Sequence, residues 1–263
     1  MFTDTHCHFS EHPDFDADGA YKRAIDGGVD LMINVAFDVK SSFDCMEFAS
    51  SHKGVYFTAG IHPDSAKEVT EENLNLIKPA FFNEKCLGVG EIGLDYHYGK
   101  DREEQIKAFV RQIELADELK LPFSVHSRDC TQDMIDVLKA NRSLINNGAI
   151  MHCYSGSLES AKIYLDLGFY ISFSGTLTFK NARSLPEVCA YTPIDRILSE
   201  TDTPYLAPET DSDYCRILVC LCSDDIPHAH EPGILLFRCH VCEYVFCSGM
   251  SSPEVAPASC LFF

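Results

Sequence analysis

The sequence has no tryptophan and is short of positive charge. Its 263 residues include 40 acidic and 21 basic side chains, which gives a formal net charge of -19. Most of this excess lies in residues 1–209, which hold 33 acidic and 19 basic side chains. The composition therefore excludes a broad basic surface for a nucleic-acid backbone, and a phosphate-containing substrate would need local cations such as bound metal ions.

Long apolar runs are also missing. No run approaches the length of about 20 residues that spans a bilayer, and residues 1–4 read Met-Phe-Thr-Asp, without the basic and apolar regions of a secretory signal. We therefore predict a cytoplasmic protein that does not bind a membrane. With 46% hydrophobic residues, the chain can form one large α/β domain.

Cysteines are distributed unevenly. Six of the 13 are scattered singly over residues 1–209, whereas seven lie in the last 54 residues. We expect the six scattered cysteines to be ordinary buried thiols. The cluster near the end indicates a segment of different character.

Short apolar runs alternate with helical patterns over the first 200 residues. The apolar runs are residues 2–5, 29–35, 55–60, 86–90, 122–125, 149–151, 169–173 and 196–198. The helical patterns are residues 19–26, 39–50, 71–82, 102–119, 131–140, 158–167 and 182–190. Eight strands joined by right-handed helical crossovers close into a (β/α)8 TIM barrel. An open, doubly wound α/β sheet is the alternative.

Imidazole and carboxylate groups follow several of these runs. In a barrel, the carboxyl ends of the strands meet at one mouth, where active sites form. His6 and His8 are one residue apart, so a strand directs both rings to one side. The candidate metal ligands are His6, His8, Glu91, His126, His152 and Asp202.

These groups predict a site for two divalent cations. Two cations about 3.5 to 4 Å apart need a shared anionic ligand, and Glu91 suits that position. His6, His8 and Asp202 would hold one ion, and His126 and His152 the other. Mixed imidazole and carboxylate ligation fits Zn²⁺, Mn²⁺ or Mg²⁺. A water between the ions would ionise near neutral pH, and Asp202 would serve as general base; Glu91 and Asp202 are thus the catalytic candidates.

Two further residues are candidates for substrate binding. Arg128 and His62 lie where they could hold phosphate oxygens, Arg128 through two parallel hydrogen bonds. Each also has an alternative interpretation. Arg128 could pair with Asp129 or Asp133, and His62 could order the loop in which it lies.

The chain resembles the TatD family of metal-dependent deoxyribonucleases, which are amidohydrolase-like TIM barrels. The resemblance covers residues 2–208 and rests on the motifs DTHCH, GIHPD, VGEIGLDYH, PFSVHSRD, HCYSGS, SFSGTLTF and PIDRILSETDTPYLAP. It implies metal binding at the six candidate ligands. It also implies hydrolysis of phosphodiester bonds in DNA, typically by an exonuclease acting on single strands, and we expect a monomer.

Two other functions stay open at this point. Related barrels hydrolyse amides, lactones or phosphotriesters, and many bridge their ions with a modified lysine, whereas the fourth run here offers Glu91. The chain could also be an inactive or poorly folded divergent member that binds metal or DNA without turnover.

The last 55 residues depart from the family pattern. We predict a TatD-like barrel over residues 1–208 and a divergent, cysteine-rich segment over residues 209–263, part of the same domain or disordered. Pro257 falls inside the expected last helix, which it would interrupt. A small zinc site would use Cys220, Cys222, Cys239 and Cys242, although the first pair is closer than zinc-ribbon spacing.

Overall fold

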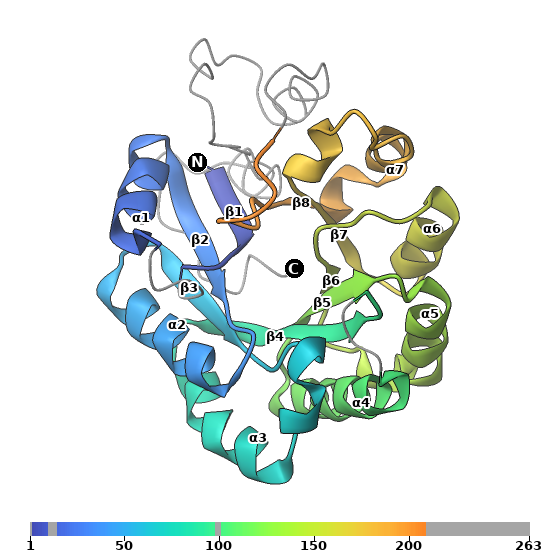
Figure 1. Cartoon of the computed structure of the whole chain (residues 1–263), viewed down its shortest axis with the longest axis horizontal. Coiled ribbons are helices and arrows are strands. Elements are labelled where there is room, and N and C mark those ends of the chain that lie inside the picture. Colours follow the sequence, from blue (N-terminus) through green and yellow to red (C-terminus); the bar gives the residue numbers. More distant parts are fainter. Residues whose placement is uncertain (1, 10–14, 98–100, 209–263) are drawn as a thin grey trace, which may run out of the picture.

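A computed structural model describes residues 2–9, 15–97 and 101–208 of the chain. Eight parallel strands follow one another around a barrel in the order of the sequence, and helices surround them (Figure 1). The strands are β1 (Phe2–Cys7), β2 (Val29–Val35), β3 (Val55–Ala59), β4 (Cys86–Asp95), β5 (Phe123–Arg128), β6 (Ala149–Met151), β7 (Tyr170–Phe173) and β8 (Ile197–Ser199). This order confirms the predicted (β/α)8 barrel, since a doubly wound sheet would reverse direction within its strand order.

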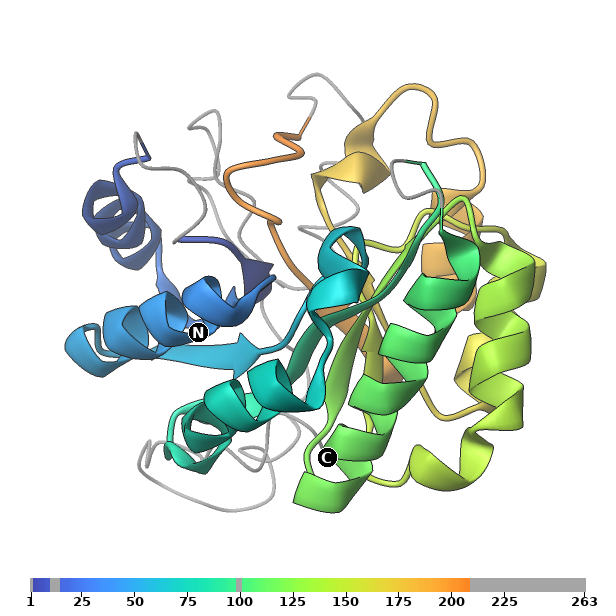
Figure 2. The same cartoon turned by 60° about the horizontal axis from the view of Figure 1, so that its bottom comes forward.

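Seven α-helices occupy the crossovers of the described chain, on the outside of the strands (Figure 2). They are α1 (Ala17–Asp26), α2 (Val39–Ser51), α3 (Glu71–Ile77), α4 (Arg102–Leu119), α5 (Thr131–Ala140), α6 (Leu158–Asp166) and α7 (Leu185–Tyr191). Short 3-10 helices are η1 (Pro63–Glu68), η2 (Lys78–Phe82), η3 (Arg142–Leu144), η4 (Gly175–Thr178) and η5 (Ile194–Arg196).

The predicted helix over residues 71–82 is divided in the structure. α3 ends at Ile77, and the 3-10 helix η2 continues from Lys78 to Phe82. Pro79 explains the change, because its ring nitrogen cannot donate the hydrogen bond that an α-helix needs there. Helix η1 was not predicted; it begins directly after His62, whose ring Nδ1 accepts a hydrogen bond from Asp64 N at 3.2 Å.

Strand β4 runs five residues beyond its predicted end. The predicted run ends at Gly90, before the charged Glu91, yet all ten residues from Cys86 to Asp95 are buried. Glu91 therefore lies inside the strand. His126 likewise lies within β5, paired in register with Gly93 of β4.

The first and last strands meet through individual hydrogen bonds. Thr5 Oγ1 donates to Ser199 O at 3.0 Å, and Ser199 Oγ donates to Thr3 O at 3.3 Å. Asp202 N donates to His6 O at 2.9 Å, just above this seam. These bonds close the barrel and hold residues that are almost 200 positions apart in the chain against each other.

Most of the hydrophobic core lies between the strands and the helices. Phe57, Phe109, Phe169 and Tyr164 are among its largest fully buried side chains. Inside the barrel, Ile33, Val35 and Leu87 form a second, smaller buried group. Five of the six cysteines before residue 209 are buried thiols, as expected, and Cys153 is half-buried.

Among the helices of the described residues, none is both long and apolar enough to cross a membrane. The predicted segment 209–263, with its four candidate zinc-binding cysteines, lies outside the described residues.

Gly93 provides a test of the contact between β4 and β5. Its φ is +146°, and a Cβ there would lie 2.1 Å from His126 O. We expect Gly93→Ala to lower the free energy of unfolding by about 3 kcal/mol or more, because it combines strain with a backbone clash. The matched control is Gly168→Ala, at φ +91° with open space around it; strain alone should cost about 1–2 kcal/mol. Equal losses in urea unfolding would contradict the assigned contact.

Candidate metal centre

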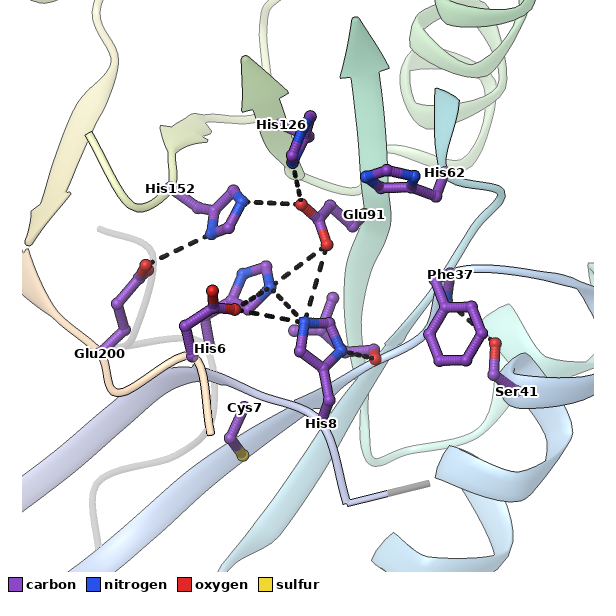
Figure 3. A network of polar contacts seen from close by, with 12 residues as sticks. His6, Cys7, His8, Phe37, Ser41, His62, Glu91, His126, His152 and Glu200 are labelled. Carbon is purple, nitrogen blue, oxygen red and sulfur yellow. Dashed lines mark hydrogen bonds and ion pairs between the residues drawn. The ribbon is translucent and has the colours of Figure 1, made fainter. Parts of the chain in front are cut away.

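Glu91 lies at the centre of the polar groups in the barrel mouth (Figure 3). Only 3% of its surface is exposed, and its two carboxylate oxygens face different partners. Oε1 lies 2.7 Å from His152 Nε2 and 2.8 Å from His126 Nδ1. Oε2 lies 3.4 Å from His6 Nε2 and 3.8 Å from His8 Nε2. One carboxylate is thus shared by two pairs of histidines.

The first group combines His6 and His8 with Asp202 and Glu91. His6 Nε2 and His8 Nε2 are 3.2 Å apart, and Asp202 Oδ1 lies 3.8 Å and 3.3 Å from them, respectively. Ligand atoms about 2.1 Å from a tetrahedrally bound cation lie about 3.4 Å from one another. The five separations known among these four atoms, 3.2 to 3.8 Å, match that spacing, so the group fits a divalent cation.

The second group consists of Glu91, His126 and His152. At separations of 2.7 and 2.8 Å, both rings donate hydrogen bonds to Glu91 Oε1. Two imidazoles and a carboxylate are common ligands of Zn²⁺ and Mn²⁺, and ligation requires neutral rings. If the three ligand atoms moved slightly apart, this group would also fit a cation. Binding of the cation would then release the ring protons.

Overlapping sets of three ligand atoms, each within 4.8 Å of one another, occur four times among the described residues. These sets are His6, Glu91 and His8; His6, His152 and Asp202; Glu91, His126 and His152; and His62, Asp95 and His126. All six side chains predicted as metal ligands belong to them. The structure therefore brings these six residues together in one place, although they are spread over almost 200 positions of the sequence.

The electrostatic environment stabilises a negative charge at the centre. Burial alone would raise the pKa of Glu91, but the charges of His152 and His6 and the hydrogen bonds from His126 and His152 hold it well below its ordinary value. Burial alone would likewise lower the pKa of His152, yet the charges of Glu91 and Glu200 raise it well above the usual range. The centre thus balances buried carboxylates against imidazoles.

Asp202 reaches the site through the barrel seam. Its own N–H donates to His6 O at 2.9 Å, and His8 N donates to Thr203 O at 2.7 Å. Below them, Asp4 accepts hydrogen bonds from Thr201 Oγ1 at 2.6 Å and from Thr201 N at 3.0 Å. Burial would raise the pKa of Asp202, but the hydrogen bond from His8 and the charge of His6 keep it below its ordinary value, so the side chain is ionised.

Two carboxylates at the site were missed by the sequence analysis. Asp95 Oδ2 accepts a hydrogen bond from His126 Nε2 at 2.9 Å, and Glu200 Oε1 lies 3.3 Å from His152 Nδ1. Spacing gives a signal for Asp95 but not for Glu200. Asp95 lies four residues after Glu91 on the same strand, an even spacing that favours one side of the strand. Glu200 and Asp202 follow the end of β8, where Asp202 has φ +58° and strand alternation does not apply.

The two predicted substrate-binding residues lie at the edge of the site. The His62 ring packs edge-to-face on His126, with centroids 4.5 Å apart. Arg128 is exposed at the end of β5. Burial raises the pKa of the neighbouring Asp64, and the charge of Arg128 opposes part of that rise. The suggested acidic neighbours of Arg128 have other partners: Asp129 accepts from His97 Nδ1, and Asp133 from the Tyr96 hydroxyl.

Comparison with known proteins agrees with this fold. The family model "TatD related DNase" matches residues 3–220. The uncharacterized metal-dependent hydrolase YabD of Bacillus subtilis is 40% identical over 210 residues, covering 79% of this chain and 82% of that protein. The uncharacterized metal-dependent hydrolase YcfH of Escherichia coli is 34% identical over 214 residues and 79% of each chain. The crystal structure of the TatD homolog YjjV from E. coli superposes with a TM-score of 0.74 at 30% identity, covering 84% of this chain and 89% of that one.

The fold and the site define a (β/α)8 barrel with a histidine and carboxylate centre at its mouth. Together with these matches, the fold and the site show that the chain belongs to the TatD-related DNase family, a family of metal-dependent hydrolases.

His62 predicts a pH dependence of stability. Burial lowers the pKa of its ring from 6.5 to about 4, and only 16% of the side chain is exposed. The unfolded chain takes up this proton at higher pH than the folded one, so the contribution is present above pH 6.5 and is lost as pH falls toward 4. Between pH 7.5 and pH 5, we expect the free energy of unfolding to fall by about 2 kcal/mol more in the wild type than in His62→Asn. Identical losses in urea titrations at the two pH values would contradict the buried, neutral ring.

Proposed function

We propose that this protein is a deoxyribonuclease that hydrolyses phosphodiester bonds with two divalent cations, Zn²⁺, Mn²⁺ or Mg²⁺. The observation that carries the proposal is the position of Glu91, whose two oxygens face two separate groups of ligand atoms. The family description supports DNA as the substrate. In this proposal His6, His8, Asp202 and Glu91 hold one cation, and Glu91, His126 and His152 hold the other.

The proposed cations supply the positive charge that the amino-acid composition lacks. When bound, they provide Lewis-acid activation of a water molecule and of the phosphate, and they neutralise phosphate charge. The chain as a whole has a net charge of -19, so attraction of a DNA phosphate has to be local. A substrate bound only through this mouth needs no extended basic surface.

Asp202 acts as the general base in the proposed reaction. Its Oδ1 lies within 3.8 Å of both His6 Nε2 and His8 Nε2, and its carboxylate is ionised. It accepts a proton from the water that attacks phosphorus, while the bond from phosphorus to the leaving oxygen breaks. The same carboxyl group then gives the proton to the leaving oxygen, which completes the hydrolysis.

His62 and Arg128 bind the substrate in this scheme. At neutral pH His62 carries no charge, because burial lowers its pKa to about 4, and Nδ1 accepts a hydrogen bond from Asp64 N. Its Nε2–H is then a neutral donor for a phosphate oxygen. Arg128, exposed at the end of β5, supplies the positive charge at the same side of the mouth.

A single-stranded end is the favoured substrate. His6 is fully buried and Glu91 is 3% exposed, so a scissile phosphate has to enter the mouth of the barrel. The end of a flexible strand enters more easily than the middle of a duplex. We therefore propose exonuclease activity on single strands. We also propose that the protein is a monomer in the cytoplasm, with residues 1–208 as the catalytic barrel.

The test is digestion of end-labelled single-stranded DNA by the wild type and Glu91→Gln with Mg²⁺, Mn²⁺ and Zn²⁺. Cations contribute several kcal/mol to the transition state, so we expect Glu91→Gln to reduce kcat/KM by about 1000-fold or more. The matched control is Glu47→Gln on the exposed side of α2, which should retain wild-type activity. Retained activity in Glu91→Gln would remove Glu91 from the centre.

Parallel assays separate this function from its alternatives. Hydrolysis of a phosphotriester or a cyclic amide, with no release of nucleotides from DNA, would identify a hydrolase of another substrate class. No turnover of any substrate, with a melting temperature that rises on addition of Mn²⁺, would identify an inactive metal-binding member.

A further inference from the structure

A buried carboxylate stands behind the proposed metal centre and takes no part in the reaction described above. Glu200 is the first residue after β8, and its side chain is fully buried. Its backbone N–H donates to Phe173 O at 3.1 Å, which fixes the residue at the end of β7. Burial of a carboxylate costs several kcal/mol unless partners compensate. This cost points to a role for the side chain.

The contact of Glu200 is directed at the rear of one proposed ligand (Figure 3). Glu200 Oε1 lies 3.3 Å from His152 Nδ1, whereas His152 Nε2, on the opposite side of the ring, lies 2.7 Å from Glu91 Oε1. The imidazole therefore lies between two carboxylates. Only the one at its front belongs to the proposed metal ligands.

We propose that Glu200 is a positioning residue that holds His152 as a metal ligand through Nε2. The inference rests on the proposed two-cation centre. Because a carboxylate can only accept, Nδ1 of His152 keeps its hydrogen and donates it to Glu200. The lone pair of a neutral ring is then at Nε2, on the side of Glu91, and metal-ligating histidines are commonly oriented and made more basic by such a partner.

The effect extends to the first group of ligands through ring stacking. The rings of His6 and His152 are stacked, with centroids 3.9 Å apart and an angle of 14° between the planes. Rotation of the His152 ring would therefore disturb His6 as well. Glu200 Oε2 is buried without a hydrogen-bond partner among the described residues, so this side chain has no second hydrogen bond that would replace the one to His152.

The experiment measures metal binding by the full-length protein, without reference to DNA. Protein stripped with a chelator is titrated with Mn²⁺, and free Mn²⁺ is followed by electron paramagnetic resonance. We expect Glu200→Ala to weaken binding of the cation held by Glu91, His126 and His152 by about 10- to 100-fold. Binding of the other cation should change less. Glu200→Gln keeps an oxygen that accepts the Nδ1 hydrogen, so its affinity should lie within a few-fold of the wild type.

Histidine tautomers provide a second measurement. In protein labelled with ¹⁵N-histidine and loaded with Zn²⁺, the wild type and Glu200→Gln should show His152 with its hydrogen on Nδ1. Glu200→Ala should show exchange between forms. The matched control is Thr192→Val, which removes a buried hydrogen bond to Val188 O after α7 and should leave affinity and tautomer unchanged.

Three results would overturn the proposal. Glu200→Ala could bind both cations with wild-type affinity, or Glu200→Gln could lose affinity as strongly as Glu200→Ala, which would make Glu200 a direct ligand. Thr192→Val could weaken binding as much as Glu200→Ala, which would reduce the effect to general stability. Loss of DNA cleavage alone bears on the proposed nuclease and not on Glu200, because every readout here is metal binding or ring chemistry.

Discussion

The buried carboxylate of Glu91 is the interaction on which the site depends. An ionised carboxylate with 3% exposure would destabilise the fold unless charges and donors surround it. Here His126 and His152 contact one oxygen, and His6 and His8 approach the other. The same arrangement that makes burial tolerable also creates two adjacent groups of ligand atoms. Stability and the proposed chemistry thus share one set of contacts.

The barrel seam determines whether both groups can exist together. His6 lies in the first strand and His8 directly follows it, whereas Glu200 and Asp202 follow the last strand. Side-chain and backbone hydrogen bonds between these segments, including Asp202 N to His6 O at 2.9 Å, join them. Elsewhere in the barrel, backbone pairing between parallel strands joins the neighbours. At the seam, threonine, serine and aspartate side chains take over part of that role, as in the bonds of Thr201 to Asp4.

Much of this fold could be predicted from alternation of apolar runs and helical patterns. The bounds of β2, β6, α4 and α5 agree with prediction, because apolar residues and turn residues mark both ends of each element. The end of β4 did not follow from the pattern. In the sequence, Glu91 ends a hydrophobic run. The strand nevertheless continues, because partners from distant parts of the chain compensate the charge of Glu91.

Contacts with distant parts of the chain also separate the predicted site residues from the missed ones. His6, His8, Glu91, His126, His152 and Asp202 were found because imidazoles and carboxylates follow strands that share one mouth. Asp95 and Glu200 have the same chemistry, but they act through a neighbouring imidazole. Only the ring orientations of His126 and His152 show these contacts. No sequence pattern specifies which nitrogen of a ring faces which carboxylate.

The central claim is that Glu91 joins two cation sites at the barrel mouth. Anomalous scattering from crystals grown with Mn²⁺ tests it most directly. The account predicts two peaks about 3.5 to 4 Å apart, one near His6, His8 and Asp202 and the other near His126 and His152, with an oxygen of Glu91 at each. A single peak away from Glu91, or two peaks that leave its carboxylate without a metal, would contradict the account.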